Sequence, residues 1–355
     1  MKTYKIGIIQ GDGVGPELVA SAKAVLETVC AGEIQLDFHE EDGGADTYAR
    51  TGMNLSVDAL NRIKNEYAAT LKGPVGLPSV RKPDGTEGGL LGGTLRGGLD
   101  AYANVRPIRS IPNVRTPMRS DLGPIDYVIV RENTEGLYLS RGLGVGNDRA
   151  SSDQLLMTRV GIERVVHFAF KLAQTRGGAP KDGIRRVTCV DKSNVIRTYA
   201  FFRQIFDEIA PQYPDIEVDY RYSDAAGHDL VFNPGHFDVL VMENFLGDLL
   251  SDVGAATVGG LGMCPSGNVG ESGAYFEPIH GSAPTIAGKN LANPISQILS
   301  AALMLRHIGE PELGAKIEAA VDLAFARKSI DILETGSPKD GTTSVTDAVI
   351  LALRG

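Results

Sequence analysis

Short apolar runs alternate along this chain with longer stretches in which apolar residues recur every three or four positions. The short runs have the length of β-strands and lie at 5–9, 126–130, 186–190, 216–222 and 237–242. The longer stretches have the period of amphipathic helices and lie at 16–29, 154–174, 195–210, 295–308 and 312–327. This alternation predicts an α/β fold in which helices cover a sheet. Because 355 residues exceed the usual size of one core, we expect two domains.

Composition and charge exclude several classes of function. The formal net charge is −9, so the chain has no general attraction for nucleic acid. No segment reaches the roughly 20 apolar residues of a membrane span, and the apolar run near the N-terminus is too short for a signal peptide. The cysteines Cys30, Cys189 and Cys264 are scattered, which argues against disulfides and structural zinc. We therefore expect a cytoplasmic protein that binds neither nucleic acid nor membrane.

Two aspartates, Asp248 and Asp252, follow the apolar run at 237–242. If this segment is helical, their carboxylates lie on one face, one turn apart. Two like charges at that spacing cost a helix about 0.2–0.5 kcal/mol, which a bound cation would offset. Mg²⁺ or Mn²⁺ suits the pair because both ions prefer oxygen ligands. The alternative interpretation is a solvated acidic helix face.

The segment Gly11–Glu17 follows the first predicted strand and opens a helix at Pro16. Proline is well suited to the first turn of a helix. The dinucleotide fingerprint of an ordinary Rossmann fold would need a glycine at this position. The segment therefore indicates a tight strand-to-helix turn and argues against an ordinary Rossmann fold.

Three arginines are candidates for binding an anionic substrate, and one lysine is a candidate general base. Arg96 and Arg106 flank the point where a helix leads into an extended segment, and Arg131 follows the strand at 126–130. Convergent guanidinium groups bind carboxylates through paired hydrogen bonds. Lys192 follows another strand, at the edge where open α/β sheets bind ligands. Taken singly, each arginine is better explained as a member of a surface ion pair, and the alternative for Lys192 is an ordinary turn residue.

Several segments, in a fixed order along nearly the whole chain, resemble the isocitrate/3-isopropylmalate dehydrogenase family of β-decarboxylating dehydrogenases, which includes homoisocitrate and tartrate/D-malate dehydrogenases. They are Gly11–Glu17, Tyr102–Pro107, Arg131–Tyr138, Asp191–Asn194, Glu243–Asp248, Glu277–Pro284 and Asn293–Pro294. Each segment alone is weak, but their common order is highly specific. The resemblance favours the metal interpretation of Asp248 and Asp252.

The resemblance implies an α/β two-domain fold with a mixed sheet, distinct from an ordinary Rossmann fold. Residues 1–105 and 259–355 would form a large cofactor-binding domain. Residues 106–258 would form a small domain that carries the dimer interface. The active site would lie in the cleft between the domains and would be shared between the subunits of a homodimer.

The resemblance also assigns roles to individual residues. A 2-hydroxy acid with a carboxylate on C3 would bind to Arg96, Arg106 and Arg131. The metal, Mg²⁺ or Mn²⁺, would bind to Asp248 and Asp252 of one subunit and to Asp224 of the other. Lys192, also from the other subunit, would remove the hydroxyl proton, and Tyr138 would deliver a proton to C3 after decarboxylation.

The cofactor site implied by the resemblance contains Glu87, Asn194, His280, Gly281, Ser282, Ala283, Thr285, Ile286 and Asn293. NAD users of the family usually carry Asp at the position of Thr285, and NADP users carry Lys followed by Tyr. The pair Thr285-Ile286 lacks the cation and the phenol that would bind a 2′-phosphate. We therefore predict NAD rather than NADP as the cofactor.

The substrate pattern departs from the family at one place. Glu87–Leu91 resembles the isopropylmalate enzymes, but Gly92-Gly93 makes the segment before Arg96 two residues longer. Without that gap, Leu90 and Gly92 stand where isocitrate enzymes carry Ser and Asn, and the additional Arg of homoisocitrate enzymes is absent. We predict a 3-isopropylmalate-like substrate, a 3-substituted (2R)-malate, with isocitrate, homoisocitrate or tartrate/D-malate dehydrogenase activity as alternatives.

Two further alternatives are not enzymes. A non-catalytic regulatory subunit of the same fold would be expected to lose catalytic residues, whereas Tyr138 and Lys192 are both present. A simple carboxylate-binding module would not need both of these groups. The sequence therefore favours an active NAD-dependent, metal-dependent dehydrogenase.

Overall fold

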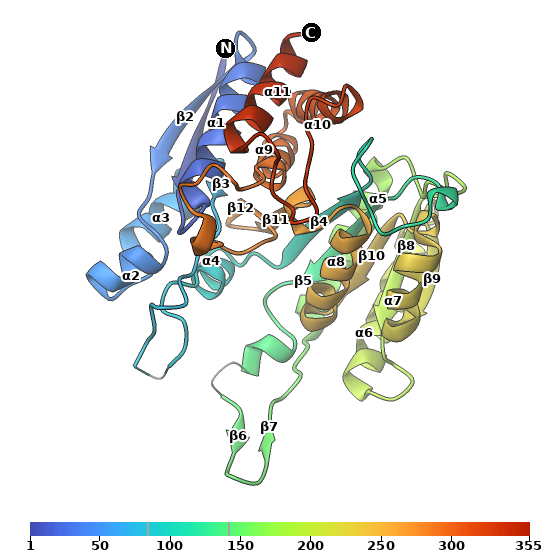
Figure 1. Cartoon of the computed structure of the whole chain (residues 1–355). Coiled ribbons are helices and arrows are strands. Elements are labelled where there is room, and N and C mark those ends of the chain that lie inside the picture. The colour runs from blue at the N-terminus through green and yellow to red at the C-terminus, as the bar shows by residue number, and fades with distance from the viewer. Residues whose placement is uncertain (84, 141–142) are drawn as a thin grey trace. The chain divides into compact units, whose positions relative to one another are not determined.

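The computed structural model describes residues 1–83, 85–140 and 143–355. The chain forms two compact units (Figure 1). Unit 1 contains Met1–Ala101, Ile111–Arg115 and Gly259–Gly355, and unit 2 contains Tyr102–Ser110 and Thr116–Val258. The roles assigned to the two predicted domains, and a site in a cleft between them, stay predictions.

Unit 1 contains five strands and seven α-helices among the described residues, together with two short 3-10 helices. The strands are β1 (Lys2–Ile9), β2 (Ile34–Glu40), β3 (Ala69–Lys72), β11 (Pro265–Gly270) and β12 (Gly273–Pro278). The α-helices are α1 (Gly15–Cys30), α2 (Ala45–Thr51), α3 (Val57–Asn65), α4 (Gly92–Gly98), α9 (Ile295–His307), α10 (Pro311–Ala326) and α11 (Thr342–Arg354). The 3-10 helices are η5 (Leu261–Met263) and η6 (Pro284–Ile286).

The strands of unit 1 are ordered β2-β1-β3-β12-β11. β1 is parallel to β2 and β3, β12 is parallel to β3, and β11 is antiparallel to β12. Because side chains alternate along a strand, Ile6 and Ile8 of β1 pack into one core with α1, α9, α10 and α11. Ile9 packs into a second core with α3 and α4. Helices therefore cover both faces of the strands, as a mainly parallel sheet requires.

Unit 2 contains seven strands and four α-helices among the described residues. The strands are β4 (Ala103–Arg109), β5 (Asp126–Glu132), β6 (Val145–Gly146), β7 (Ser151–Ser152), β8 (Arg186–Asp191), β9 (Glu217–Tyr222) and β10 (Val239–Met242). The α-helices are α5 (Arg159–Thr175), α6 (Arg197–Ile209), α7 (Ser223–Phe232) and α8 (Asn244–Thr257). The 3-10 helices are η1 (Ser120–Leu122), η2 (Leu137–Ser140), η3 (Ala210–Gln212) and η4 (Pro234–His236).

The main strands of unit 2 are ordered β4-β5-β10-β8-β9. β5, β10, β8 and β9 are parallel, and β4 is antiparallel to β5. α5 packs against α6, and α7 packs against α8, so the helices form two pairs (Figure 1). The strands of each unit thus form a mixed arrangement, which confirms the predicted α/β class and the rejection of an ordinary Rossmann fold.

The predicted strands and helices are present, with two shifts at helix starts. α5 begins at Arg159 rather than at 154, because Thr158 is extended and its side chain accepts a hydrogen bond from the Gly161 amide, which caps the helix. α6 begins at Arg197 rather than at 195, since Ile196 is also extended. In both cases the helical spacing of apolar residues begins earlier in the sequence than the helical backbone does.

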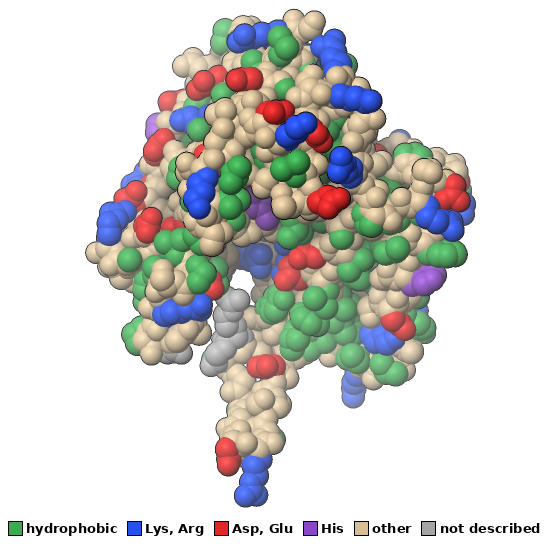
Figure 2. All heavy atoms as spheres, viewed as in Figure 1, with side chains coloured by type: hydrophobic (Ala, Val, Ile, Leu, Met, Phe, Trp, Pro, Cys, Tyr) green, Lys and Arg blue, Asp and Glu red, His purple; other side chains and the backbone are tan. Residues whose placement is uncertain are grey.

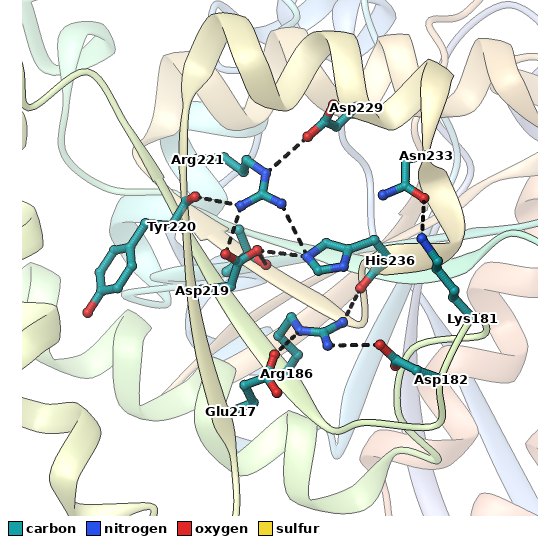
Figure 3. A network of polar contacts seen from close by, with 11 residues as sticks. Lys181, Asp182, Arg186, Glu217, Asp219, Tyr220, Arg221, Asp229, Asn233 and His236 are labelled. Atoms are coloured by element: carbon teal, nitrogen blue, oxygen red, sulfur yellow. Dashed lines mark hydrogen bonds and ion pairs between the residues drawn. The ribbon is translucent and has the colours of Figure 1, made fainter.

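A charged network holds α7 to the strands of unit 2 (Figure 3). Arg221 at the end of β9 donates to Asp219 at 2.7 Å and to Asp229 of α7 at 3.0 Å. His236 of η4 contacts the same Asp219 at 2.9 Å, and Arg186 donates to the backbone oxygen of His236 at 2.5 Å. These contacts hold the second half of α7, the helix that carries Asp224 in its first turn.

None of the helices in the described part of the chain combines the length and the apolar character needed to cross a membrane. All three cysteines are buried.

Candidate active site

α8 places both predicted metal ligands on one face of unit 2. The helix begins after Glu243, whose side chain caps it by accepting a hydrogen bond from the Leu246 amide. Asp248 and Asp252 are one turn apart, and their side chains are 36% and 57% exposed. The two carboxylates therefore share a helix face, as their spacing predicted, and are accessible to a ligand.

Two of the three predicted arginines converge on these aspartates. Arg131 of β5 donates to Asp248 Oδ1 at 2.5 Å, and the Arg106 guanidinium of β4 lies 3.4 Å from the same oxygen. Arg106 also lies 3.7 Å from Asp252. The register of the antiparallel pair β4–β5 explains why the two arginines lie close together. Arg131 is opposite Asn104, which is two residues from Arg106 and on the same face of β4.

Three residues that sequence reasoning missed orient the two guanidinium groups. Asn244 Oδ1 accepts from Arg131 Nε at 3.0 Å and from Nη2 at 2.7 Å. Asn104 accepts from Arg106 Nε at 2.7 Å, and the Ser251 hydroxyl accepts from its Nη1 at 2.5 Å. Periodicity could have found two of them, since Asn104 lies two residues before Arg106 on a strand and Asn244 lies four before Asp248 on a helix.

Gly247 allows β5 and α8 to come this close. A Cβ atom at this position would lie 2.5 Å from Cγ and 2.6 Å from Cβ of Arg131. The glycine therefore lets the Arg131 stem pass against the helix backbone while its guanidinium reaches Asp248. Arg131 is only 2% exposed, so its position is strongly determined.

Tyr138 of η2 reaches the same carboxylate. Its hydroxyl donates to Asp248 Oδ2 at 2.9 Å, and its ring meets Phe245 edge to face at 5.9 Å. Burial raises the pKa of the Tyr138 phenol, and the hydrogen bond to Asp248 raises it further. The phenol is thus held in its protonated form, as a proton donor requires.

The chemistry of this donor set fits a divalent cation. Burial raises the pKa of Asp252, the charge of Arg106 opposes this rise, and the charge of Asp248 adds to it. A cation between the two carboxylates would stabilise both in their ionised form. Within the described residues, no group of three or more His, Cys, Asp or Glu side chains is arranged to hold a metal. Asp248 and Asp252 would therefore need a further ligand from outside this cluster.

Lys192 and Asp224, which the sequence assigned to the opposite subunit's site, lie together in another part of unit 2. Lys192 Nζ donates to Asp224 at 2.6 Å, and this hydrogen bond lowers the pKa of the Asp224 carboxyl. The Asp224 side chain is largely exposed at the start of α7. Lys192 also lies over the Tyr222 ring, 5.7 Å from its centroid.

Three loops of unit 1 meet where the sequence predicted the cofactor. The Val14 amide donates to the Ser282 oxygen at 2.8 Å, and the Ser282 hydroxyl donates to the Gly76 oxygen. Asp12 is buried and accepts from the amides of Gly76 at 2.7 Å and Ala45 at 2.8 Å. The predicted cofactor residue Ser282 is therefore fixed to the turn that follows β1.

The other predicted cofactor residues of unit 1 differ in accessibility. Gly281, Ala283 and Thr285 are exposed, whereas Ile286 and His280 are partly buried. Burial lowers the pKa of the His280 imidazole, so the ring is neutral near pH 7. Exposed backbone of this kind suits contact with an extended nucleotide.

Glu87 and Asn293 occupy more constrained positions in unit 1. The Glu87 carboxylate lies 3.6 Å from Arg81, and its Oε2 lies 3.3 Å from the place of a Cβ at Gly76. Asn293 is buried, donates to Met263 Sδ at 3.3 Å and accepts from the Ile295 amide at 3.1 Å. Asn194 belongs to unit 2 and is exposed.

The comparisons with known proteins agree on one family. The sequence model described as "Isocitrate/isopropylmalate dehydrogenase" matches residues 5–349. This chain belongs to the isocitrate/isopropylmalate dehydrogenase family. It is 38% identical to a 3-isopropylmalate dehydrogenase of Corynebacterium glutamicum, over 99% of each chain. It is 41% identical to one of Frankia casuarinae, over 92% of this chain and 93% of the relative.

Two solved structures also resemble this chain over nearly its whole length. An isocitrate dehydrogenase from Methylococcus capsulatus is 36% identical, with a TM-score of 0.84 and coverage of 99% of this chain and 100% of that one. A β-decarboxylating dehydrogenase from Thermococcus kodakarensis is 36% identical, with a TM-score of 0.81 and coverage of 99% and 96%. The predicted family and enzyme class, a β-decarboxylating dehydrogenase, are confirmed.

The segment where this family member departs from the substrate pattern forms α4. Gly92 and Gly93 are its first residues, and Leu91, just before them, is fully buried in the core with Leu95. Leu90 is only partly buried. Of the two leucines, Leu90 is thus the one that remains available to a substrate.

Arg96, the third predicted arginine, lies near the end of α4 and is partly buried in unit 1.

Proposed function

We propose that this protein catalyses the metal-dependent oxidative decarboxylation of a 3-substituted (2R)-malate, with transfer of a hydride to NAD. The substrate we favour is 3-isopropylmalate or a close analogue. The observation that carries the proposal is the cluster of Arg106, Arg131, Tyr138, Asp248 and Asp252 within unit 2. It combines two cations suited to bind carboxylates, two carboxylates suited to bind a metal and one phenol suited to donate a proton.

Substrate binding would exchange the partners of the two arginines. Arg106 and Arg131 now pair with Asp248, and in the complex they would donate to the C3 carboxylate of the substrate. Asn104 and Asn244 already hold the guanidinium groups in place, so little side-chain freedom would be lost on binding. Arg96 is proposed as a third donor to the same substrate.

The proton steps are assigned to Lys192 and Tyr138. A divalent cation held by Asp248, Asp252 and Asp224 of the partner subunit would withdraw electron density from the substrate oxygens. NAD would accept the hydride from C2. Lys192 would take the hydroxyl proton as the carbonyl forms, CO₂ would leave from C3, and Tyr138 would give its phenolic proton to C3. The Tyr138 hydroxyl donates to Asp248, so it carries the proton that this step needs.

A homodimer is proposed because the pair α7–α8 exposes apolar side chains. Figure 2 shows hydrophobic side chains gathered over α8. The exposed members on the two helices are Val231, Phe232, Leu249 and Val253, with Phe232 62% exposed. Such a patch is typical of protein interfaces. A two-fold axis there would pair the same surface of each copy and would let one subunit supply Lys192 and Asp224 to the other.

The experiment that tests the function is a substrate panel. Purified protein is mixed with 3-isopropylmalate, isocitrate, homoisocitrate, tartrate and D-malate, each with NAD or NADP and with or without Mn²⁺. We expect reduced nicotinamide to form fastest with 3-isopropylmalate, NAD and Mn²⁺. If isocitrate were turned over faster than 3-isopropylmalate, isocitrate rather than 3-isopropylmalate would be the substrate. No turnover of any member would favour a non-catalytic subunit.

A cytoplasmic location is part of the same proposal.

Cofactor choice is expected to depend on Thr285. The Lys289 ammonium donates to the backbone oxygen of Thr285 at 2.8 Å, so one cation is near this position. In Thr285→Asp, the new carboxylate would accept from ribose hydroxyls, repel a 2′-phosphate and pair with Lys289. We expect the ratio of kcat/KM for NAD to that for NADP to rise about tenfold, since ~1.4 kcal/mol corresponds to that factor.

The control for this prediction is Thr285→Asn, which has nearly the same shape as Asp but no charge. It should leave the cofactor ratio within about twofold of wild type, because the repulsion of the phosphate is absent. An unchanged ratio in Thr285→Asp would contradict the assignment of this loop to the adenosine ribose.

A further inference from the structure

Glu243 is a buried carboxylate between the two segments that carry Tyr138 and Asp248. It is 1% exposed and lies at the junction of β10 and α8 in unit 2. No step proposed above uses it. A buried carboxylate must be satisfied by hydrogen bonds, so its partners indicate what it does.

The two oxygens of Glu243 bind different parts of the unit. Oε1 accepts from the Leu137 amide at 3.1 Å, one residue before Tyr138. Oε2 accepts from the Leu246 amide at 3.2 Å, in the first turn of α8. The Tyr199 hydroxyl of α6 donates to Oε2 as well, at 3.0 Å. One side chain therefore ties the Tyr138 segment to the start of the helix that carries Asp248.

The backbone at Gly136 is adapted to this contact. Its φ is +85°, and a Cβ atom there would lie 2.1 Å from Glu243 Oε1. Any other residue would push the carboxylate away from the Leu137 amide. The glycine thus permits the close approach that the hydrogen bond needs.

The choice of Glu at a helix cap also needs an explanation. Ser, Thr, Asp and Asn are the preferred N-cap residues because their short side chains reach the amides of the first turn. Glu243 caps α8, but its extra methylene group lets the second oxygen reach the neighbouring segment as well. Capping alone does not require a side chain as long as that of Glu243.

We propose that Glu243 is a positioning residue that holds the Tyr138 segment at a fixed place relative to α8, so that the phenol meets Asp248. The Tyr138 hydroxyl lies 2.9 Å from Asp248, and Glu243 bridges the two backbones that carry these side chains. This inference rests on the proposed function, because Tyr138 is taken there as the proton donor. Glu243 itself touches neither substrate nor cofactor.

Two variants remove the same hydrogen bond in different ways. Glu243→Asp shortens the side chain by about 1.5 Å, which keeps a good helix cap but leaves the Leu137 amide out of reach. Glu243→Gln keeps the length but replaces one acceptor oxygen by an amide nitrogen that cannot accept. Its one oxygen is expected to stay with the two donors Leu246 and Tyr199. Tyr199→Phe is the matched control, since it removes a hydroxyl from Glu243 but leaves both backbone links.

The measurements separate positioning from overall stability. In Glu243→Asp and Glu243→Gln, hydrogen exchange should become faster at the Leu137 amide, while exchange in the middle of α8 stays as in wild type. We expect kcat to fall about 10- to 100-fold, since displacing a reacting group by about 1 Å can cost that much. KM for the substrate and Kd for Mn²⁺ should stay within about twofold, because the arginines and aspartates keep their places. Tyr199→Phe should retain kcat within about twofold.

Three results would overturn the inference. The first is a wild-type kcat in a Glu243 variant whose Leu137 amide exchanges faster. The second is a parallel change of kcat, KM and thermal stability in the Glu243 variants. The third is a fall of kcat in Tyr199→Phe as large as that in the Glu243 variants. Failure of the proposed function would look different, because wild-type protein would then turn over no 3-substituted malate. The exchange data would still report whether Glu243 holds the Leu137 amide.

Discussion

Replacement of Asp248 by Asn is expected to lower kcat about a thousandfold or more, which corresponds to ~4 kcal/mol at 1.36 kcal/mol per factor of ten. Asp248 accepts from Arg131 and Tyr138 and is the proposed metal ligand nearest to both. Asn has almost the same volume but lacks the charge that holds a dication. Kd for Mn²⁺, measured by titration calorimetry without substrate, should therefore rise together with the loss of turnover.

The control for Asp248→Asn is Asp347→Asn, an exposed residue of α11 in unit 1 that has no role in the proposed site. It should match wild type in both measurements. Circular dichroism should show that Asp248→Asn remains folded. Full activity of this variant, or of wild type in excess chelator, would contradict the metal assignment.

A heterodimer of Lys192→Met and Tyr138→Phe chains is expected to recover up to about half of wild-type activity, although each parent homodimer is slow. In unit 2, Lys192 pairs with Asp224 and Tyr138 pairs with Asp248. If each site takes Tyr138 from one chain and Lys192 from the other, one site of the heterodimer carries both lesions and the second carries none. Two affinity tags allow the mixed species to be purified and assayed.

The matched control combines one wild-type chain with one chain that carries both substitutions. With shared sites, each site of this dimer has one lesion, so it should be as slow as the parents. With sites built within single chains, this dimer should be half active and the first heterodimer slow. The two arrangements thus predict opposite orders of activity, and the second order would refute site sharing.

Spacing along the chain was enough to predict that the two proposed metal ligands share one face of a helix. Asp248 and Asp252 are four residues apart in a segment that folds as α8, and helical geometry alone puts their carboxylates on one face. The same is true of the α/β class, since the predicted strands at 126–130 and 186–190 became β5 and β8. Local periodicity carries this information because it depends only on neighbouring residues.

Apart from Asn104, which is two residues from Arg106, the groups that orient the site act on residues far away in sequence and were not predicted. Asn244 holds Arg131 across 113 positions, and Ser251 holds Arg106 across 145. No role was predicted for Glu243 beyond its place in the family segment Glu243–Asp248, yet its carboxylate reaches Leu137 across 106 positions. Hydrogen bonds between distant segments leave no periodic pattern in the sequence.

The sequence by itself determined the α/β class, the family, and which residue types carry the proposed chemistry, because these depend on composition, period and ordered motifs. Only the tertiary structure decided that Arg106 and Arg131 meet Asp248, and that Leu91 is buried in a core rather than available to a substrate. The physical reason is that strand pairing and helix packing set these distances. A carboxylate, a guanidinium and a phenol become one site only when β4, β5, η2 and α8 are packed together.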